Sequence, residues 1–93
     1  MTDTIFERNV EIINMRGVHA RAAAKFSKVS DGFKSDIRVT KDGMTVSGLS
    51  IMGLMMLSAS KGTEIHIETS GPDAKEAMDA LVHLVNSAFH EDE

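Results

Sequence analysis

In the stretch TEIHIET at residues 63–69, polar and apolar side chains alternate from Glu64 to Glu68. Side chains at every second position of a β-strand point to the same face of the sheet. Ile65 and Ile67 would therefore face a core, while Glu64, His66 and Glu68 would face water. A sheet built from such strands has one dry face and one wet face, which is typical of antiparallel sheets. We expect helices to cover only the dry face.

Three more segments on the N-terminal side of this stretch favour strands. Residues 36–40 and 44–46 alternate in the same way, and Lys41-Asp42-Gly43 lies between them. Asp-Gly is a strong signal for a tight hairpin turn. Residues 10–13 carry Val10 and Ile12 at the spacing of a half-buried strand. The sequence thus predicts four strands.

Helical patterns fill the intervals between these strands. The run ARAAAKF at residues 20–26 is rich in alanine, the strongest helix former, and residues 50–57 form a short apolar segment. Asp73, with Glu76 three residues later, predicts a capping box for a final helix that carries an apolar stripe. The predicted order is β-α-β-β-α-β-α. We expect an α+β open-faced sandwich, with four antiparallel strands and three helices on one face.

Length and composition limit the possible classes of protein. The 93 residues predict one domain spanning 1–93, in which residues 88–93 form a frayed tail. The absence of cysteine excludes disulfides and thiolate metal sites, and with no signal-peptide or membrane-spanning pattern it favours a cytoplasmic protein. The net charge of −4 argues against nucleic acid as the main partner. No nucleotide loop or paired carboxylates stand out, so no cofactor is expected.

The segment GVHAR at residues 17–21 is the most informative place for chemistry. His19 lies where a strand has ended and a helix begins, beside the free N–H groups of the first helical turn. The partial positive charge there disfavours the imidazolium, so the ring would stay neutral and nucleophilic. The same N–H groups and Arg21 would bind an attached phosphoryl group, and Gly17 would let it approach. The simpler interpretation is that His19 is only a helix cap or a surface residue.

A second place of interest is SIMGLMML at residues 50–57. Ser50 is placed to cap the helix, and Leu54 and Leu57 share a face that would meet the core. The remaining apolar residues have two interpretations. They either belong to the core as well, or form an exposed methionine-rich surface of the kind that docks partners. The other histidines, His66, His83 and His90, lack metal-ligand spacing, so no metal site is expected.

Three motifs in order, GVHAR at 17–21, SIMGLM at 50–55 and KGTEI at 61–65, resemble those of HPr, the histidine-containing phosphocarrier family of the bacterial phosphotransferase system. The resemblance covers nearly the whole chain and implies the fold order given above. It implies that His19 accepts the phosphoryl group on Nδ1 and that Arg21 helps to hold it. It also implies that Ser50 is a regulatory site for HPr kinase/phosphorylase. Residues expected at the partner-binding surface are Gly17, Ala20, Ala22, Ile51, Met52 and Met55.

The resemblance further implies that enzyme I is the donor and a IIA-type protein the acceptor, with the chain acting as a monomeric, stoichiometric carrier and not as an enzyme. One departure is Ala22, which stands where the family usually has proline. Alanine is also a good helix residue, so we expect the site to survive. This variant is similar to HPr and NPr proteins of nitrogen-type chains, whose output is often regulation rather than sugar uptake.

Two other functions compete with phosphoryl transfer. In one, an HPr-like regulatory module acts through Ser50 or through the surface formed by Ile51, Met52 and Met55, with transfer on His19 secondary. In the other, a ligand-binding or regulatory module is built on a ferredoxin-like order of strands and helices, and His19 is only a cap. A catalytic enzyme is disfavoured because the sequence brings no second acid or base to His19.

Overall fold

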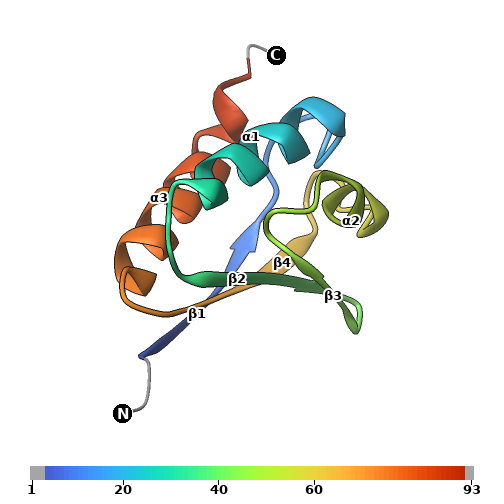
Figure 1. Ribbon diagram of the computed structural model, residues 1–93. Helices are drawn as coiled ribbons and strands as arrows, with labels where there is room; N and C mark the ends of the chain where they lie inside the picture. The colour runs from blue at the N-terminus through green and yellow to red at the C-terminus, as the bar shows by residue number, and fades with distance from the viewer. Residues whose placement is uncertain (1–3, 92–93) are drawn as a thin grey trace.

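The computed structural model describes residues 4–91, and its strands form one antiparallel sheet in the order β1-β4-β2-β3 (Figure 1). The central strand β4 pairs antiparallel with β1 on one side and with β2 on the other. The four strands are β1 (Ile5–Glu11), β2 (Asp36–Lys41), β3 (Met44–Ser47) and β4 (Glu64–Ser70). The predicted sheet is therefore confirmed.

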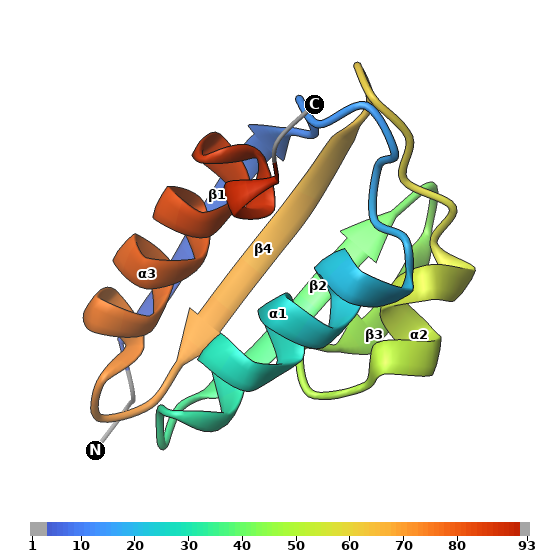
Figure 2. The ribbon, with the colours of Figure 1, turned by 90° about the horizontal axis from the view of Figure 1, so that it is seen from above.

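All three helices cover the same face of this sheet, as Figures 1 and 2 show, so the expected open-faced sandwich is also confirmed. They are α1 (Ala20–Asp31), α2 (Ile51–Met56) and α3 (Ala74–Asn86). The core between the layers contains Ile65 and Ile67 of β4, Phe26 of α1 and Leu81 of α3, each at most 2% exposed. Burial of these side chains provides the main driving force for packing the helices on this face.

The hairpin between β2 and β3 turns where the Asp-Gly pair predicted it. Lys41 pairs with Met44, and Asp42 and Gly43 between them both have positive φ, 50° and 81°. Two successive residues of this kind make the turn whose twist matches that of the flanking strands. The first strand differs from its predicted bounds of 10–13 and begins at Ile5. It is an edge strand with mostly exposed side chains, so pairing with β4 defines it better than hydrophobic alternation does.

The start of α3 differs from the predicted capping box. Asp73 makes no side-chain hydrogen bond to its own helix. Its carboxylate instead accepts hydrogen bonds from the Ser35 hydroxyl at 2.6 Å and from the backbone N–H groups of Lys34 and Ser35 at 2.9 Å. These bonds, that of the Ser35 hydroxyl foremost, lower the pKa of Asp73. Asp73 thus fastens the turn between α1 and β2 to the beginning of α3.

The expectation of a frayed tail at residues 88–93 is wrong for the part that the structure describes. Residues Ala88–His90 form a short 3₁₀ turn, η1, and Phe89 is fully buried in the core. Residues 92–93 lie outside the described residues. No helix within residues 4–91 is long and apolar enough to cross a membrane.

The bonds to Asp73 predict a pH-dependent contribution to stability. Because its pKa lies below the ordinary value of 3.8, the contribution is present above that pH and is lost as the pH falls through the folded-state pKa. The free energy of unfolding of Asp73→Asn should therefore differ most from wild type near neutral pH and converge with it in acid. Urea unfolding at several pH values measures this, and Asp79→Asn controls for loss of a carboxylate on the same helix. A difference independent of pH would contradict the prediction.

Candidate functional site

His19 is the residue immediately before α1, and its ring caps the helix. Its backbone is extended, with φ −81° and ψ −177°, and its carbonyl accepts the hydrogen bond of the Ala23 N–H at 2.8 Å. The ring atom Nδ1 accepts a hydrogen bond from the backbone N–H of Arg21 at 3.2 Å. A nitrogen that accepts such a bond carries a lone pair and no proton. The fold therefore presents Nδ1 as the nucleophilic atom at the helix start.

The other ring nitrogen of His19 has a partner from the far end of the chain. Nε2 lies 2.8 Å from Oε2 of Glu91, which follows the 3₁₀ turn. An ionised carboxylate can only accept, so the proton of the neutral ring resides on Nε2. The sequence brought no second acid or base to His19, but the structure brings the carboxylate of Glu91 to it. The contact with Glu91 thus favours the neutral tautomer in which the lone pair is on Nδ1.

Burial and hydrogen bonding act in opposite directions on Glu91. Burial, the largest effect, raises the pKa of this carboxyl group because it penalises the charged form. The hydrogen bonds from His19 and Asn14, together with electrostatic attraction to His19 and Lys25, outweigh burial and leave the pKa below its ordinary value of 4.5. Glu91 is therefore an anion at neutral pH, with its side chain only 11% exposed.

Asn14 completes this arrangement and was not identified from the sequence. Its side chain is fully buried, and Nδ2 donates to the carbonyl oxygen of Gly17 at 2.7 Å and to Oε1 of Glu91 at 2.6 Å. Both partners only accept, which fixes the orientation of the amide. Asn14 thus connects the loop before His19 to the carboxylate behind it. A polar residue within a loop gives no sequence signal for such burial, and Glu91 is 72 positions from His19.

Gly17 has a different role from the one expected. It is buried with φ +66°, and a Cβ built there would lie 2.3 Å from the carbonyl oxygen of Ala59. The missing side chain therefore makes room for the backbone before β4 and not for an approaching phosphoryl group. The neighbouring Val18 N–H donates to the same carbonyl at 2.8 Å. Close contact between the loop before α1 and the loop before β4 positions the segment that carries His19.

The other residues predicted around His19 separate into two groups. Arg21 and Ala20 are exposed. The Arg21 guanidinium is a cation that has no hydrogen-bond or ion-pair partner among the described side chains of residues 4–91. Ala22 is fully buried, so its expected place in a partner-binding surface is wrong. Its side chain faces the core because it lies on the inner side of α1.

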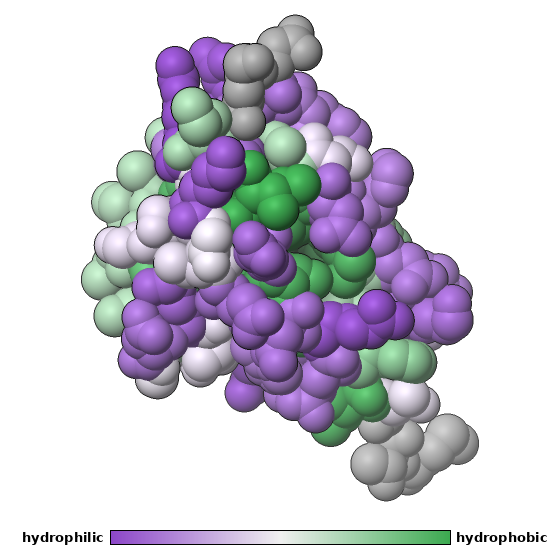
Figure 3. Space-filling model, turned by 180° about the vertical axis from the view of Figure 1, so that it is seen from behind, coloured by the Kyte–Doolittle hydropathy of each residue, from purple (hydrophilic) through white to green (hydrophobic). Residues whose placement is uncertain are grey.

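The α2 segment resolves the two interpretations of the methionine-rich run. Leu54 and Leu57 are buried as expected, and Ser50 caps the helix by accepting from the Gly53 N–H at 2.9 Å. The other apolar residues are exposed by 40–72% and form what we call the α2 patch: Ile51, Met52, Met55 and Met56. Figure 2 shows α2 beside the first turns of α1. In Figure 3, pale green atoms follow the left edge of the molecule, on the side where α2 lies.

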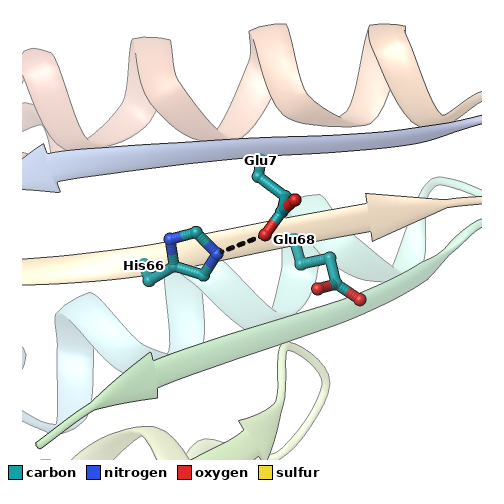
Figure 4. A group of neighbouring side chains, drawn as sticks. All are labelled: Glu7, His66 and Glu68. Atoms are coloured by element: carbon teal, nitrogen blue, oxygen red, sulfur yellow. Dashed lines mark hydrogen bonds and ion pairs between the residues drawn. The ribbon is translucent and has the colours of Figure 1, made fainter.

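A separate cluster lies on the open face of the sheet (Figure 4). Glu7, His66 and Glu68 bring one ligand-type atom each within 4.8 Å of one another. His66 Nε2 lies 2.9 Å from Glu7, and its Nδ1 lies 2.7 Å from the side-chain oxygen of Asn9. Both ring nitrogens therefore already have partners, and the side chains are at least partly exposed. This cluster is explained by pairing across strands β1 and β4.

Comparison with known proteins shows the family to which the chain belongs. A family model described as "PTS HPr component phosphorylation site" matches residues 6–87. The chain belongs to the HPr family. It is 52% identical over 89 residues to the phosphocarrier protein HPr of Neisseria meningitidis, which covers 96% of this chain and 100% of that relative. The phosphocarrier protein NPr of Escherichia coli is 38% identical over 87 residues, which cover 92% of this chain and 97% of that relative.

Solved HPr structures share the fold as well as the sequence. The crystal structure of HPr from Thermoanaerobacter tengcongensis superposes with a TM-score of 0.90 at 42% identity, covering 95% of this chain and 99% of that one. The HPr of Bacillus anthracis gives a TM-score of 0.84 at 40% identity, with 88% and 98% covered. The family to which the chain belongs is thus one of phosphocarriers of the phosphotransferase system.

The close approach at Gly17 predicts a large cost for added bulk. Gly17→Ala should destabilise the fold by about 2–4 kcal/mol, because it combines an unfavourable positive φ with a clash against backbone. Gly62→Ala is the matched control: its φ is +90°, but nothing lies within 4 Å, so it should cost only about 1 kcal/mol. Chemical unfolding measures both values. Equal costs would show that the contact with Ala59 has no role.

Proposed function

We propose that this HPr-family chain carries a phosphoryl group on Nδ1 of His19, accepting it from a phosphohistidine of enzyme I and passing it to a histidine of a IIA-type protein. The observation that carries the proposal is the lone pair of Nδ1, which faces the start of α1 on a half-buried ring. Membership of a phosphocarrier family supports the assignment of this atom as the phosphoryl acceptor.

The transfer step exchanges one phosphorus–nitrogen bond for another. The lone pair of Nδ1 forms the new bond as the bond in the donor's phosphohistidine breaks, and that electron pair returns to the donor nitrogen. The Arg21 N–H, which holds Nδ1 at 3.2 Å, then donates to a phosphoryl oxygen. The free guanidinium of Arg21 adds a charge-assisted contact. Delivery to the acceptor reverses these steps, so the carrier needs no cofactor of its own.

The α2 patch is the proposed docking surface for both partners. It lies beside the first turns of α1, and exposed methionines adapt to more than one apolar surface. Donor and acceptor would use it in turn, which suits a monomer that leaves this side open. We place the relay in the cytoplasm, in keeping with a chain without cysteine.

Replacement of His19 tests the phosphocarrier function directly. After incubation with enzyme I, Mg²⁺ and phosphoenolpyruvate, intact mass should show one acid-labile phosphoryl group on wild type and none on His19→Ala. His66→Ala, which removes a histidine from the open face of the sheet, should be modified like wild type. Unmodified wild type, with an enzyme I that is active on another carrier, would contradict the proposal.

Regulation through Ser50 is a second candidate function, because this serine directly precedes the α2 patch. Its hydroxyl oxygen accepts from the Gly53 N–H, and Ile51 and Met52 follow it with 42% and 72% exposure. Phosphorylation there by an HPr kinase/phosphorylase would add about two negative charges beside the docking surface. These charges would weaken docking to an acidic surface of enzyme I through repulsion and through desolvation of the phosphate.

A charged substitution at Ser50 tests this regulation. Ser50→Asp should remain folded, since aspartate is a good helix cap, but should accept phosphate from enzyme I about tenfold more slowly at low salt. Thr4→Asp adds the same charge at an exposed residue that directly precedes β1, whose start lies at the end of the molecule away from α2 (Figure 1). Initial rates of phosphorylation compare the variants. A Ser50→Asp protein as fast as wild type would refute the mechanism.

A further inference from the structure

We propose that Glu91 is a positioning residue for phosphoryl transfer, acting through Nε2 of His19 to hold the neutral ring in the tautomer whose lone pair is on Nδ1 and to balance the charge that the ring acquires. The inference rests on the phosphocarrier function proposed above and adds a residue to its site. The family match covers residues 6–87, which include His19 and Arg21 but end before Glu91. The carboxylate therefore lies beyond the residues that the family model matches.

Two side chains hold the carboxylate, one at each oxygen. Oε2 of Glu91 meets Nε2 of His19 at 2.8 Å, while Oε1 accepts from Nδ2 of the buried Asn14 at 2.6 Å. Asn14 also holds the carbonyl of Gly17 at 2.7 Å, two residues before the histidine. Both oxygens of the carboxylate are thus engaged, and the same amide fixes the loop that carries the ring. A chance surface ion pair would not share a buried partner in this way.

The turn that delivers Glu91 is held independently of the ion pair. Phe89 is fully buried, and its carbonyl accepts a hydrogen bond from Nζ of Lys25 on α1 at 2.6 Å. Glu91 N–H donates to the carbonyl of Ala88 at 3.1 Å. Ala88, Phe89 and His90 all have φ between 53° and 57°, a conformation that residues other than glycine adopt rarely. Such a backbone persists when its surroundings fix it, and here the buried phenyl ring does so.

The chemical consequence follows from the charges on the ring. When Nδ1 attacks the phosphorus atom, Nε2 keeps its proton and the imidazole becomes a cation. A carboxylate bonded to that proton stabilises the developing positive charge more in the transition state than in the neutral starting ring. The repulsion between Glu91 and the incoming phosphoryl group is weaker, because the two groups are on different nitrogens of the ring and the backbone N–H of Arg21 lies on the Nδ1 side. Glu91 is therefore expected to accelerate acceptance of the group.

The test compares Glu91→Gln with Glu76→Gln, which removes the same charge from an exposed residue near the start of α3. Potassium phosphoramidate serves as the donor, because it offers a phosphorus–nitrogen bond, loses ammonia and needs no docking surface. Proton NMR of the unphosphorylated proteins supplies a readout that does not depend on transfer. Wild type and Glu76→Gln should show a slowly exchanging, downfield Nε2 proton. In Glu91→Gln this signal should move upfield or be lost, and phosphorylation should slow by about tenfold.

The possible outcomes separate the role of Glu91 from the phosphocarrier function itself. Absence of the protected Nε2 proton from wild type, or phosphorylation of Glu91→Gln as fast as wild type or faster, would overturn the role of Glu91 while leaving the phosphocarrier function intact. A protected proton in a wild-type protein that neither phosphoramidate nor enzyme I can phosphorylate would overturn the phosphocarrier function, and the positioning role with it. A slower Glu91→Gln with an unchanged Nε2 signal would also overturn the proposal, because the effect would not act through His19.

Discussion

Burial on only one face of the sheet is the constraint on which the rest of the structure depends. Because β4 points isoleucines to one side and charged or polar groups to the other, all three helices must pack on the same side. The chain that leaves β1 therefore has to cross from the sheet to the helical layer. It does so with its loop fastened to residues 59–63, through bonds that join Ile12 to Thr63 and Val18 to Ala59 at 2.8 Å. His19 lies at the end of this connecting segment, where its ring contacts the first turn of α1.

The elements that sequence predicts well are those decided by local chemistry. Alternation along residues 63–69 specified a half-buried strand, and Asp42-Gly43 specified a turn that needs two residues of positive φ. His19 as a helix cap follows in the same way, since the ring and the N–H that it accepts are only two residues apart. In each case the interacting groups are neighbours in the chain, so their spacing carries the information.

The features that could not be predicted depend on contacts between distant segments. Glu91 in a polar tail looks solvated, and only the buried Phe89 two residues before it shows why the carboxylate returns to His19. Asp73 has the sequence of a helix cap but finds stronger donors at Lys34 and Ser35, which the sheet brings beside it. The apolar run of α2 has hydrophobic residues on every side, so periodicity alone cannot say that Leu54 faces inward and Met52 outward. That choice is made by packing against α1 and β3.

The hydrogen bond to Nε2 has a consequence for the regiochemistry of the product. A free imidazole offers two nitrogens and can yield two isomeric phosphoramidates. In this fold one nitrogen is occupied by a carboxylate that is itself held by an inward-facing amide, so the ring has a single reactive edge. Under the proposed function, the isomer is decided before any partner arrives, and every proposed partner meets the same reactive nitrogen. A shuttle proposed to serve several partners gains from such uniformity, because each of them needs to be shaped for only one geometry of approach.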